Sequence, residues 1–291
     1  MSALQKYIES RQSASHLVYM PYITLGDPDF EHSVAFAIEM IDAGAPILEL
    51  GIPFSDPTAD GPVIQAAMVR SIARQDFSLA QVFECAGRIH RARPAVPLVF
   101  LTYLNPVMSR YQRDANAADH AELRAASFST DAIALAMRGF LDACQANGVR
   151  GLVIPDLPFD APEAPVLRQE AAARGIDQIQ LIAPNTSAER LHKISKVASG
   201  FIYYVTSLGV TGMRTTLPPD ISNRVQQIKA ASGVPVLAGF GISQPEQVKP
   251  LRDQLDGVIV GSRNQSLIAE HGAEAGFYLS RLTSEFVQAC L

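Results

Sequence analysis

An acidic residue interrupts one of the short apolar runs of the chain. Glu49 lies within the sequence ILELG at residues 47–51, whose other members are apolar or glycine. If its side chain points into an apolar interior, burial raises the pKa of the carboxyl group and permits proton exchange near neutral pH. The alternative is an outward-facing Glu49 that is solvated or paired with a basic residue. The run itself leaves both orientations open.

A proline-rich loop follows directly and carries two more carboxylates. Asp56 and Asp60 lie in PFSDPTADGP at residues 53–62, which has almost no bulky apolar side chain. Two carboxyl groups from one strand and its loop, Glu49 and Asp60, could share a pocket and divide the roles of acid and base. Asp56 and Asp60 could instead cap turns, as aspartate often does beside proline and glycine.

Glycines follow three predicted strands late in the chain. Gly239-Phe240-Gly241 ends one strand and opens a helix, Gly261-Ser262 ends the next strand, and GVTG at 209–212 follows the strand before them. Backbone N–H groups at such turns and helix starts bind phosphate, often after the last two strands of a barrel. We predict a phosphate site here, and the alternative is that each glycine merely ends an element.

Lysine and histidine do not occur at the carboxyl ends of the predicted strands. No lysine is therefore placed to form a Schiff base with a carbonyl substrate. The missing histidine disfavours an isomerase of the triosephosphate type and a histidine-rich metal site. We expect no metal, and any cleavage chemistry must depend on carboxylates.

Eight short apolar runs, separated by helical segments, must position these residues. The runs are apolar almost throughout, as is typical of parallel strands buried on both faces. Eight such strands close a (β/α)8 TIM barrel, which we predict as a single domain over residues 1–291. An open doubly wound sheet is the rival, but LGD at 25–27 is not its Gly-rich turn. The predicted strands are 17–23, 47–50, 98–103, 151–154, 178–182, 201–205, 234–239 and 257–260.

Capping signals place the helices between these strands. Ser78 to Gln81 and Ser243 to Glu246 read as capping boxes, and Gly148, Gly175 and Gly233 read as helix C-caps. The predicted helices are 30–43, 79–91, 131–147, 162–174, 187–197, 219–231, 245–252 and 276–289.

The segment 109–130 interrupts the alternation of strands and helices. It is polar, rich in alanine and without a clear apolar face, and it is far longer than the usual loop of 2–6 residues. We interpret it as an insertion on the side of the barrel where the strands end, with a short helix over 116–126.

The composition excludes several classes of protein. Of the 291 residues 48% are hydrophobic and 18% are charged, which is typical of a folded protein with a large core. The net charge of −5 comes without a basic stripe, so we expect no nucleic-acid binding. No apolar stretch is long enough to span a membrane and no signal peptide is visible. With three scattered cysteines, we expect a soluble cytoplasmic protein whose thiols are buried.

Five segments together resemble the signature segments of the tryptophan synthase α chain family, and they occur in the family's order. They are YITLGDP at 22–28, LELGIPFSDPTADGP at 48–62, VIPDLP at 153–158, GVTG at 209–212 and GFGIS at 239–243. The resemblance covers roughly residues 15–265 and extends to plant indole-glycerol-phosphate lyases, which act without a β partner. It implies a carbon–carbon lyase that splits indole-3-glycerol phosphate into indole and glyceraldehyde 3-phosphate by a retro-aldol reaction.

The resemblance also implies roles for individual residues. Glu49 matches the family's proton shuttle, Asp60 matches the carboxylate that holds the indole N–H, and Tyr203 matches the tyrosine near the reacting carbon. The wall of the indole pocket is matched by Tyr22, Phe100, Val153 and Leu181. The phosphate and loop-closure positions are matched by Thr211, Gly212, Phe240, Gly241, Gly261 and Ser262.

The family implies no cofactor in this chain, because pyridoxal phosphate belongs to a separate β chain that receives the indole. Three departures from its pattern concern that partner and the phosphate. Ser207 stands where the mobile loop often carries arginine, Arg-Asn-Gln follows Ser262, and the 109–130 insertion enlarges a loop near the partner-docking face. If a β chain is the partner, we expect this chain to bind a conventional one weakly or not at all.

Two other functions compete with the lyase. One is a catalytically weakened α-like barrel that binds ligand and regulates a β chain, against which the intact Glu49 and Asp60 argue. The other is a phosphosugar isomerase on the same barrel. Such enzymes need an acid or cysteine at the ends of strands one and five, and here strand five ends in Ala183-Pro184-Asn185.

Overall fold

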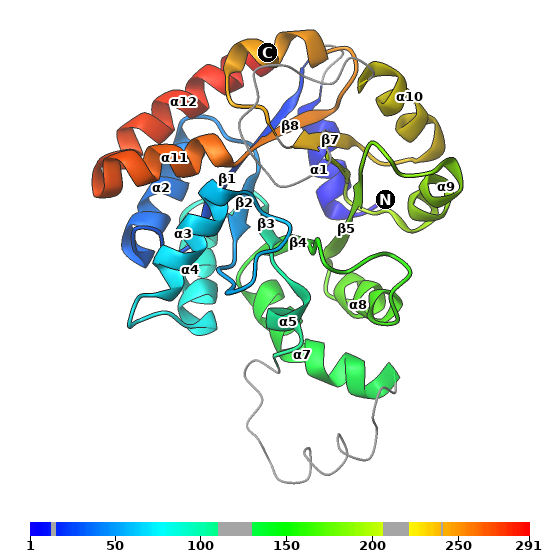
Figure 1. The fold of residues 1–291 in the computed structure, drawn as a ribbon, viewed down its shortest axis with the longest axis horizontal. Helices are drawn as coiled ribbons and strands as arrows, with labels where there is room; N and C mark the ends of the chain where they lie inside the picture. The colour runs from blue at the N-terminus through cyan, green and yellow to red at the C-terminus, as the bar shows by residue number, and fades with distance from the viewer. Residues whose placement is uncertain (13–15, 110–129, 206–220, 240) are drawn as a thin grey trace.

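Eight parallel strands form a closed barrel in the order β1 to β8 (Figure 1). The computed structural model describes residues 1–12, 16–109, 130–205, 221–239 and 241–291. Each strand pairs in parallel with the next one, and β8 pairs with β1. The closed barrel of eight parallel strands confirms the predicted (β/α)8 fold. The strands are β1 (Val18–Thr24), β2 (Leu48–Gly51), β3 (Leu98–Leu101), β4 (Val149–Val153), β5 (Asp177–Ile182), β6 (Ile202–Val205), β7 (Val236–Gly239) and β8 (Gly257–Val260).

Helices surround the barrel and connect successive strands (Figure 1). The predicted helices agree with the observed ones to within a few residues, except over 245–252. Those observed are α2 (Phe30–Asp42), α4 (Leu79–Ala92), α7 (Thr130–Ala146), α8 (Glu163–Ala172), α9 (Ala188–Val197), α10 (Ile221–Ala231) and α12 (Ala275–Cys290). Within the described ranges, four α-helices were not predicted: α1 (Ala3–Arg11), α3 (Pro62–Ile72), α5 (Leu104–Val107) and α11 (Ser262–His271).

The predicted helix 245–252 is wrong in type and in its cap. The segment forms two short 3-10 turns, η1 (Pro245–Gln247) and η2 (Lys249–Leu251). The cap is Gln244 rather than Ser243, because the Gln247 side chain turns back and accepts the backbone N–H groups of both residues. A third 3-10 turn, η3 (Gly272–Glu274), joins α11 to α12.

Of the other predicted helix caps, some are confirmed and one is wrong. The Ser78 hydroxyl accepts the Gln81 amide at the start of α4, as expected. Gly148 and Gly175 follow helices with φ of 78° and 69°, the left-handed conformation that terminates a helix. Gly233 does not adopt this conformation, so its predicted role as a C-cap is wrong. The predicted helix over 116–126 lies outside the described residues.

The buried side chains form two layers that follow from strand alternation. Val99 and Leu101 of β3 point into the barrel, whereas Leu98 and Phe100 point outward to the helices. The outer layer packs between strands and helices and contains Cys85, Cys144 and Cys290, which are buried and form no disulfide. In the described part of the chain no helix is long and apolar enough to cross a membrane.

Helix α1 packs at the end of the barrel where the strands begin. Leu4 and Ile8 belong to the inner apolar layer, and the Gln5 side chain donates a hydrogen bond to the Gly233 carbonyl at 2.8 Å. The helix therefore covers the end of the barrel opposite to the one where the strands finish. The carboxyl ends of the strands are left for the site.

Replacing Ile8 with alanine should expose how much this cover contributes. The side chain is fully buried, so Ile8→Ala should lower the free energy of unfolding by about 2–4 kcal/mol. Urea denaturation gives the value, and Lys6→Ala on the exposed face of α1 is the control. Equal, small effects of the two variants would show that α1 contributes little to the stability of the barrel.

Candidate active site

Glu49 points into the barrel. On β2 it lies in register with Tyr22 of β1 and Val99 of β3, both of which belong to the inner layer. Its side chain is 1% exposed, and Oε1 has no hydrogen-bond partner among the described residues. Burial raises the pKa of this carboxyl to about 8, and the nearby charge of Asp60 adds to the shift. The outward, salt-bridged orientation is excluded.

Asp60 ends the loop between β2 and α3 and is 3% exposed. Its Oδ2 accepts a hydrogen bond of 2.7 Å from the Tyr103 hydroxyl. The N-cap residue of α3 is Gly61, so the Asp60 side chain does not cap that helix. Burial raises the pKa of Asp60 to about 6, against the lowering effect of the Tyr103 hydrogen bond. Asp56 of the same loop is exposed, unlike this buried pair.

Three tyrosines surround the carboxyl pair. Burial raises the pKa of Tyr22 and Tyr203 well above its usual value, and the charges of Glu49 and Asp60 raise it further. The Tyr22 hydroxyl shares a hydrogen bond of 2.9 Å with the Thr24 hydroxyl. The structure therefore brings predicted Tyr22 and Tyr203 together with Glu49 and Asp60.

Two glycines make room for these rings. A Cβ atom at Gly51 would collide with the Tyr22 hydroxyl, and one at Gly239 would collide with the Tyr203 hydroxyl. Both glycines end strands, β2 and β7, beside the strands that carry the tyrosines. A larger residue at either position would displace a ring from the site.

The sequence prediction missed Tyr103, which lies two residues beyond β3. It continues the inward alternation of Val99 and Leu101, and its ring belongs to the inner layer. The signal was present in the sequence, but it required the register of a strand that is apolar on both faces. Tyr103 is the third tyrosine of the site and the partner of Asp60.

The structure places three residues of the predicted indole wall inside the barrel and one outside it. Tyr22 and Val153 are buried in the inner layer, and half-buried Leu181 packs against it. Phe100 points the other way and meets the ring of Phe83 on α4 with centroids 5.9 Å apart. Phe100 therefore cannot line a pocket inside the barrel, and Leu101 takes the inward position beside it.

Part of the predicted phosphate site falls on described residues. Gly261 and Ser262 start α11 directly after β8, where free backbone N–H groups favour an anion. Gly241 lies between β7 and η1 with a φ of 96°. Thr211, Gly212, Phe240 and Ser207 lie outside the described residues, so their positions stay predictions.

The polar residues after Ser262 hold α11 in place. Asn264 donates hydrogen bonds to the carbonyl oxygens of Tyr22 at 3.2 Å and Val260 at 2.9 Å. Gln265 accepts the Thr24 amide at 3.2 Å and donates to Asp27 at 3.1 Å. Both side chains are fully buried. Asn264 and Gln265 therefore anchor the helix to β1, next to the carboxyl pair.

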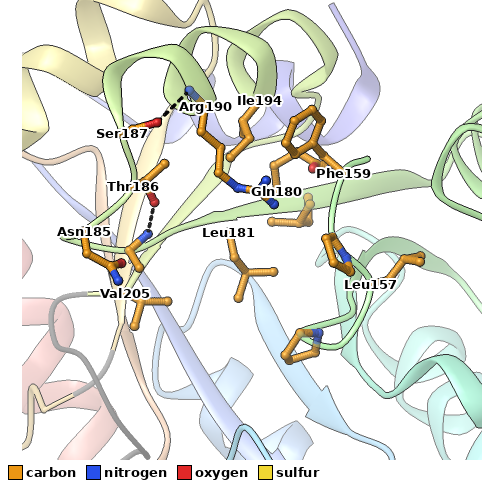
Figure 2. Close-up of a pocket in the computed structure, with 14 residues that line it drawn as sticks. Leu157, Phe159, Gln180, Leu181, Asn185, Thr186, Ser187, Arg190, Ile194 and Val205 are labelled. Atoms are coloured by element: carbon orange, nitrogen blue, oxygen red, sulfur yellow. Dashed lines mark hydrogen bonds between the residues drawn. The ribbon is translucent and has the colours of Figure 1, made fainter. Parts of the chain in front are cut away.

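A cavity of about 540 Å³ opens at the ends of β5 and β6 (Figure 2). Leu181 and Val205 form the side that joins the inner layer, and Leu181 lies in register with Tyr203. On the opposite side the Arg190 guanidinium lies 4.7 Å from the centre of the Phe159 ring. Arg190 is already paired with Asp160 at 3.0 Å. The cavity has the size of a site for a small metabolite and adjoins the strand position of Tyr203.

No arrangement of three or more metal-binding side chains occurs within the described ranges. What the site offers is therefore two buried carboxyl groups of different pKa, with tyrosine hydroxyls around them. Such a pair can donate a proton from one group and stabilise positive charge with the other.

Comparison with known proteins gives one consistent family. The model of the tryptophan synthase alpha chain family matches residues 8–288. A tryptophan synthase alpha chain of Leptospira interrogans is 41% identical over 274 residues, which are 94% of this chain and 92% of that protein. One from Geobacillus thermodenitrificans is 38% identical over 252 residues, covering 87% and 83%.

Solved structures agree with these relatives. Mycobacterium tuberculosis tryptophan synthase superposes with a TM-score of 0.81 at 28% identity, covering 99% of this chain and 98% of the other. Tryptophan synthase subunit alpha from Legionella pneumophila gives 0.80 at 31% identity, covering 100% and 98%.

The buried Glu49 makes the stability of the protein depend on pH. A carboxyl whose pKa rises from 4.5 to about 8 on folding destabilises the folded state as pH rises between these values. Glu49→Gln carries no charge at any pH, so it should gain stability over wild type across this range, by on the order of 4 kcal/mol.

Urea unfolding at pH 5 and at pH 8.5 measures the difference. Glu84→Gln, on an exposed residue of α4, is the control and should show no such dependence. If the difference in free energy of unfolding between Glu49→Gln and wild type is the same at both pH values, Glu49 ionises as readily in the folded protein as in the unfolded one.

Proposed function

Because the chain belongs to the tryptophan synthase alpha chain family, we propose that Glu49 and Asp60 perform its cleavage of indole-3-glycerol phosphate. The chain is a carbon–carbon lyase of that family, and the resemblance inferred from its sequence is confirmed. One observation carries the assignment of residues. The two carboxyls are buried beside each other, and burial raises the pKa of Glu49 to about 8 and that of Asp60 to about 6.

The difference between these two pKa values assigns the roles. Burial raises the pKa of Glu49 further than that of Asp60, so Glu49 keeps its proton at pH values at which Asp60 is already ionised. Glu49 gives its proton to C3 of the indole ring, which creates a positively charged indolenine. Asp60 accepts the indole N–H and stabilises that charge, as an ionised neighbour of the acid can.

The second step returns the proton to Glu49. As a carboxylate, Glu49 takes the proton of the glycerol hydroxyl next to the indole, and the new oxygen electron pair forms the aldehyde. The carbon–carbon bond breaks, and its electrons neutralise the indolenine to give indole. Glyceraldehyde 3-phosphate is the other product, and Glu49 is protonated again. One group thus serves as acid and then as base.

Substrate binding is assigned to the residues around this pair. Tyr22, Val153 and Leu181 provide apolar surface for the indole, and Tyr203 lies by the reacting carbon. The phosphate is held by backbone N–H groups near Gly241, Gly261 and Ser262, with Thr211, Gly212 and Phe240 as further contacts. The cleavage needs only proton transfers and charge stabilisation, which supports a chain that works without a cofactor of its own.

A tryptophan synthase β chain is the partner that fits this family, and pyridoxal phosphate belongs to that chain. The finer proposal concerns the 109–130 insertion. It follows β3 and α5, and therefore begins at the barrel end that carries the Asp60 loop. A segment of this length that starts from that rim and carries many polar residues should obstruct or reshape the contact with a conventional β chain.

Neither competing function is favoured. A weakened barrel that only regulates a β chain would not need two buried carboxyls at a cost in stability. An isomerase of phosphosugars would need an acid or cysteine after β5, where Ala183-Pro184-Asn185 stands.

Replacing either carboxyl should abolish most of the activity. General acid–base catalysis contributes about 10²–10⁴-fold, and Glu49 acts in two steps, so Glu49→Gln should lower kcat by about 10³–10⁴-fold. Asp60→Asn should lower it by about 10²-fold or more, since an amide cannot offset the indolenine charge. Indole release from the isolated chain is the measurement, and Glu84→Gln is the control. More than about a tenth of wild-type kcat in Glu49→Gln would remove Glu49 from the mechanism.

Deleting 110–128 and joining the ends with a short Gly-Ser bridge should separate partnership from chemistry. We expect indole release by the isolated chain to change by no more than about threefold, because Glu49 and Asp60 stay in place. Binding to a conventional β chain, measured by calorimetry, should tighten. A tight, activating complex between the intact chain and such a β chain would contradict the proposal.

A further inference from the structure

We propose that Tyr103 is a positioning residue of the lyase, whose hydroxyl holds the Asp60 carboxylate in place and keeps it ionised opposite Glu49. The inference rests on the function proposed above and extends it to a residue that neither the sequence motifs nor the family resemblance singled out. Both carboxyls are buried, and the Tyr103 hydrogen bond explains why Asp60 rather than Glu49 is the ionised one.

The geometry fixes the direction of the hydrogen bond. The Tyr103 oxygen accepts the backbone N–H of Ala59 at 3.1 Å and lies 2.7 Å from Oδ2 of Asp60. With its lone pair facing the Ala59 amide, the hydroxyl directs its single proton to the carboxylate. A donor so placed favours the charged form of Asp60 over the neutral one.

The ring of Tyr103 also holds the loop that carries Asp60. It stacks on Phe54 of the same loop, with ring centres 5.0 Å apart and planes inclined by 25°. Tyr103 therefore contacts the loop at Phe54, at the Ala59 backbone and at the Asp60 carboxylate. The Tyr103 side chain is itself buried just beyond β3, so the loop is held by a residue fixed to the barrel.

Among the described residues, four titratable groups face Asp60 from the elements around it. They are Tyr22 on β1, Glu49 on β2, Tyr103 after β3 and Tyr203 on β6. Burial raises the pKa of both carboxyls, and among these groups the Tyr103 hydrogen bond is the one that lowers the pKa of Asp60. Without this hydrogen bond the pKa values of the two carboxyls lie closer together. The pH range in which Glu49 is protonated and Asp60 is ionised then becomes narrower.

Tyr103→Phe tests the role, because it removes one oxygen and keeps the ring on Phe54. The loss of a hydrogen bond to a charged group should raise the pKa of Asp60 by about one unit. In the pH profile of kcat the acid limb should shift upward by the same amount. This corresponds to about tenfold lower kcat at pH 5 and less than about twofold at pH 7.5.

A second measurement does not depend on activity. Titration of the Asp60 carboxyl by carbon-13 NMR in the ligand-free protein should show the same upward shift. Placing 3-fluorotyrosine at position 103 makes the hydroxyl a stronger donor and should move the Asp60 titration in the opposite direction. The matched control is Tyr19→Phe, which removes a buried tyrosine oxygen from the outer face of β1, where the ring stacks on Phe286.

The outcomes distinguish this inference from the function on which it rests. An active wild type together with an unshifted Asp60 titration and acid limb in Tyr103→Phe overturns the inference, even if the variant is less stable. A wild type that releases no indole contradicts the lyase instead, and the NMR titration still decides whether Tyr103 controls Asp60. A shift in Tyr19→Phe equal to that in Tyr103→Phe would also overturn the specific role.

Discussion

The burial of two carboxyl groups in one apolar space is the constraint on which the rest of the site depends. Glu49 and Asp60 cannot both ionise there without a large cost, since neither is well solvated and their charges repel. The surroundings of the two carboxyls differ. Asp60 accepts a hydrogen bond from Tyr103, whereas Oε1 of Glu49 has no partner among the described residues. These unequal surroundings give the two carboxyls different pKa values, and that difference is what permits acid and base chemistry.

A buried pair of this kind must be held rigidly, and a second polar network does so. Asp27, after β1, accepts two hydrogen bonds of 2.8 Å from Arg70 on α3 and one of 3.1 Å from Gln265 on α11. Helix α3 continues from the Asp60 loop, and α11 begins at Ser262. Asp27 therefore ties the carboxylate end of the site to the predicted phosphate end.

Much of the fold was predictable because parallel strands buried on both faces leave apolar runs that differ in composition from the helices. The missed helices have physical reasons too. Helix α3 begins with Pro62 inside what reads as a proline-rich loop, and α11 begins with polar residues that usually indicate an exposed surface. Asn264 and Gln265 are polar because they pair with β1 inside the protein. A sequence does not show which polar residues are paired in the interior.

The same feature that made the strands visible hid which side chains face inward. Glu49 is the single polar residue of β2. The sequence therefore raised the question of whether its side chain points inward or outward. In β3 all four residues are apolar, and Phe100 and Leu101 are equally plausible until the pairing with β2 and β4 fixes the register. That register places Leu101 inside and Phe100 outside.

Extending the β3 alternation by two residues reaches Tyr103 and its contact with Asp60, which no motif in the sequence indicated. The adjacent tyrosines of β6 show the converse case. Tyr203 faces the carboxyls and Tyr204 faces the helices, and only the family resemblance could choose between them beforehand. Catalytic carboxyls are visible in a sequence because they are exceptions in an apolar strand. The neighbours that tune them are apolar or aromatic like everything around them, and their place in the site is decided by the closure of the barrel.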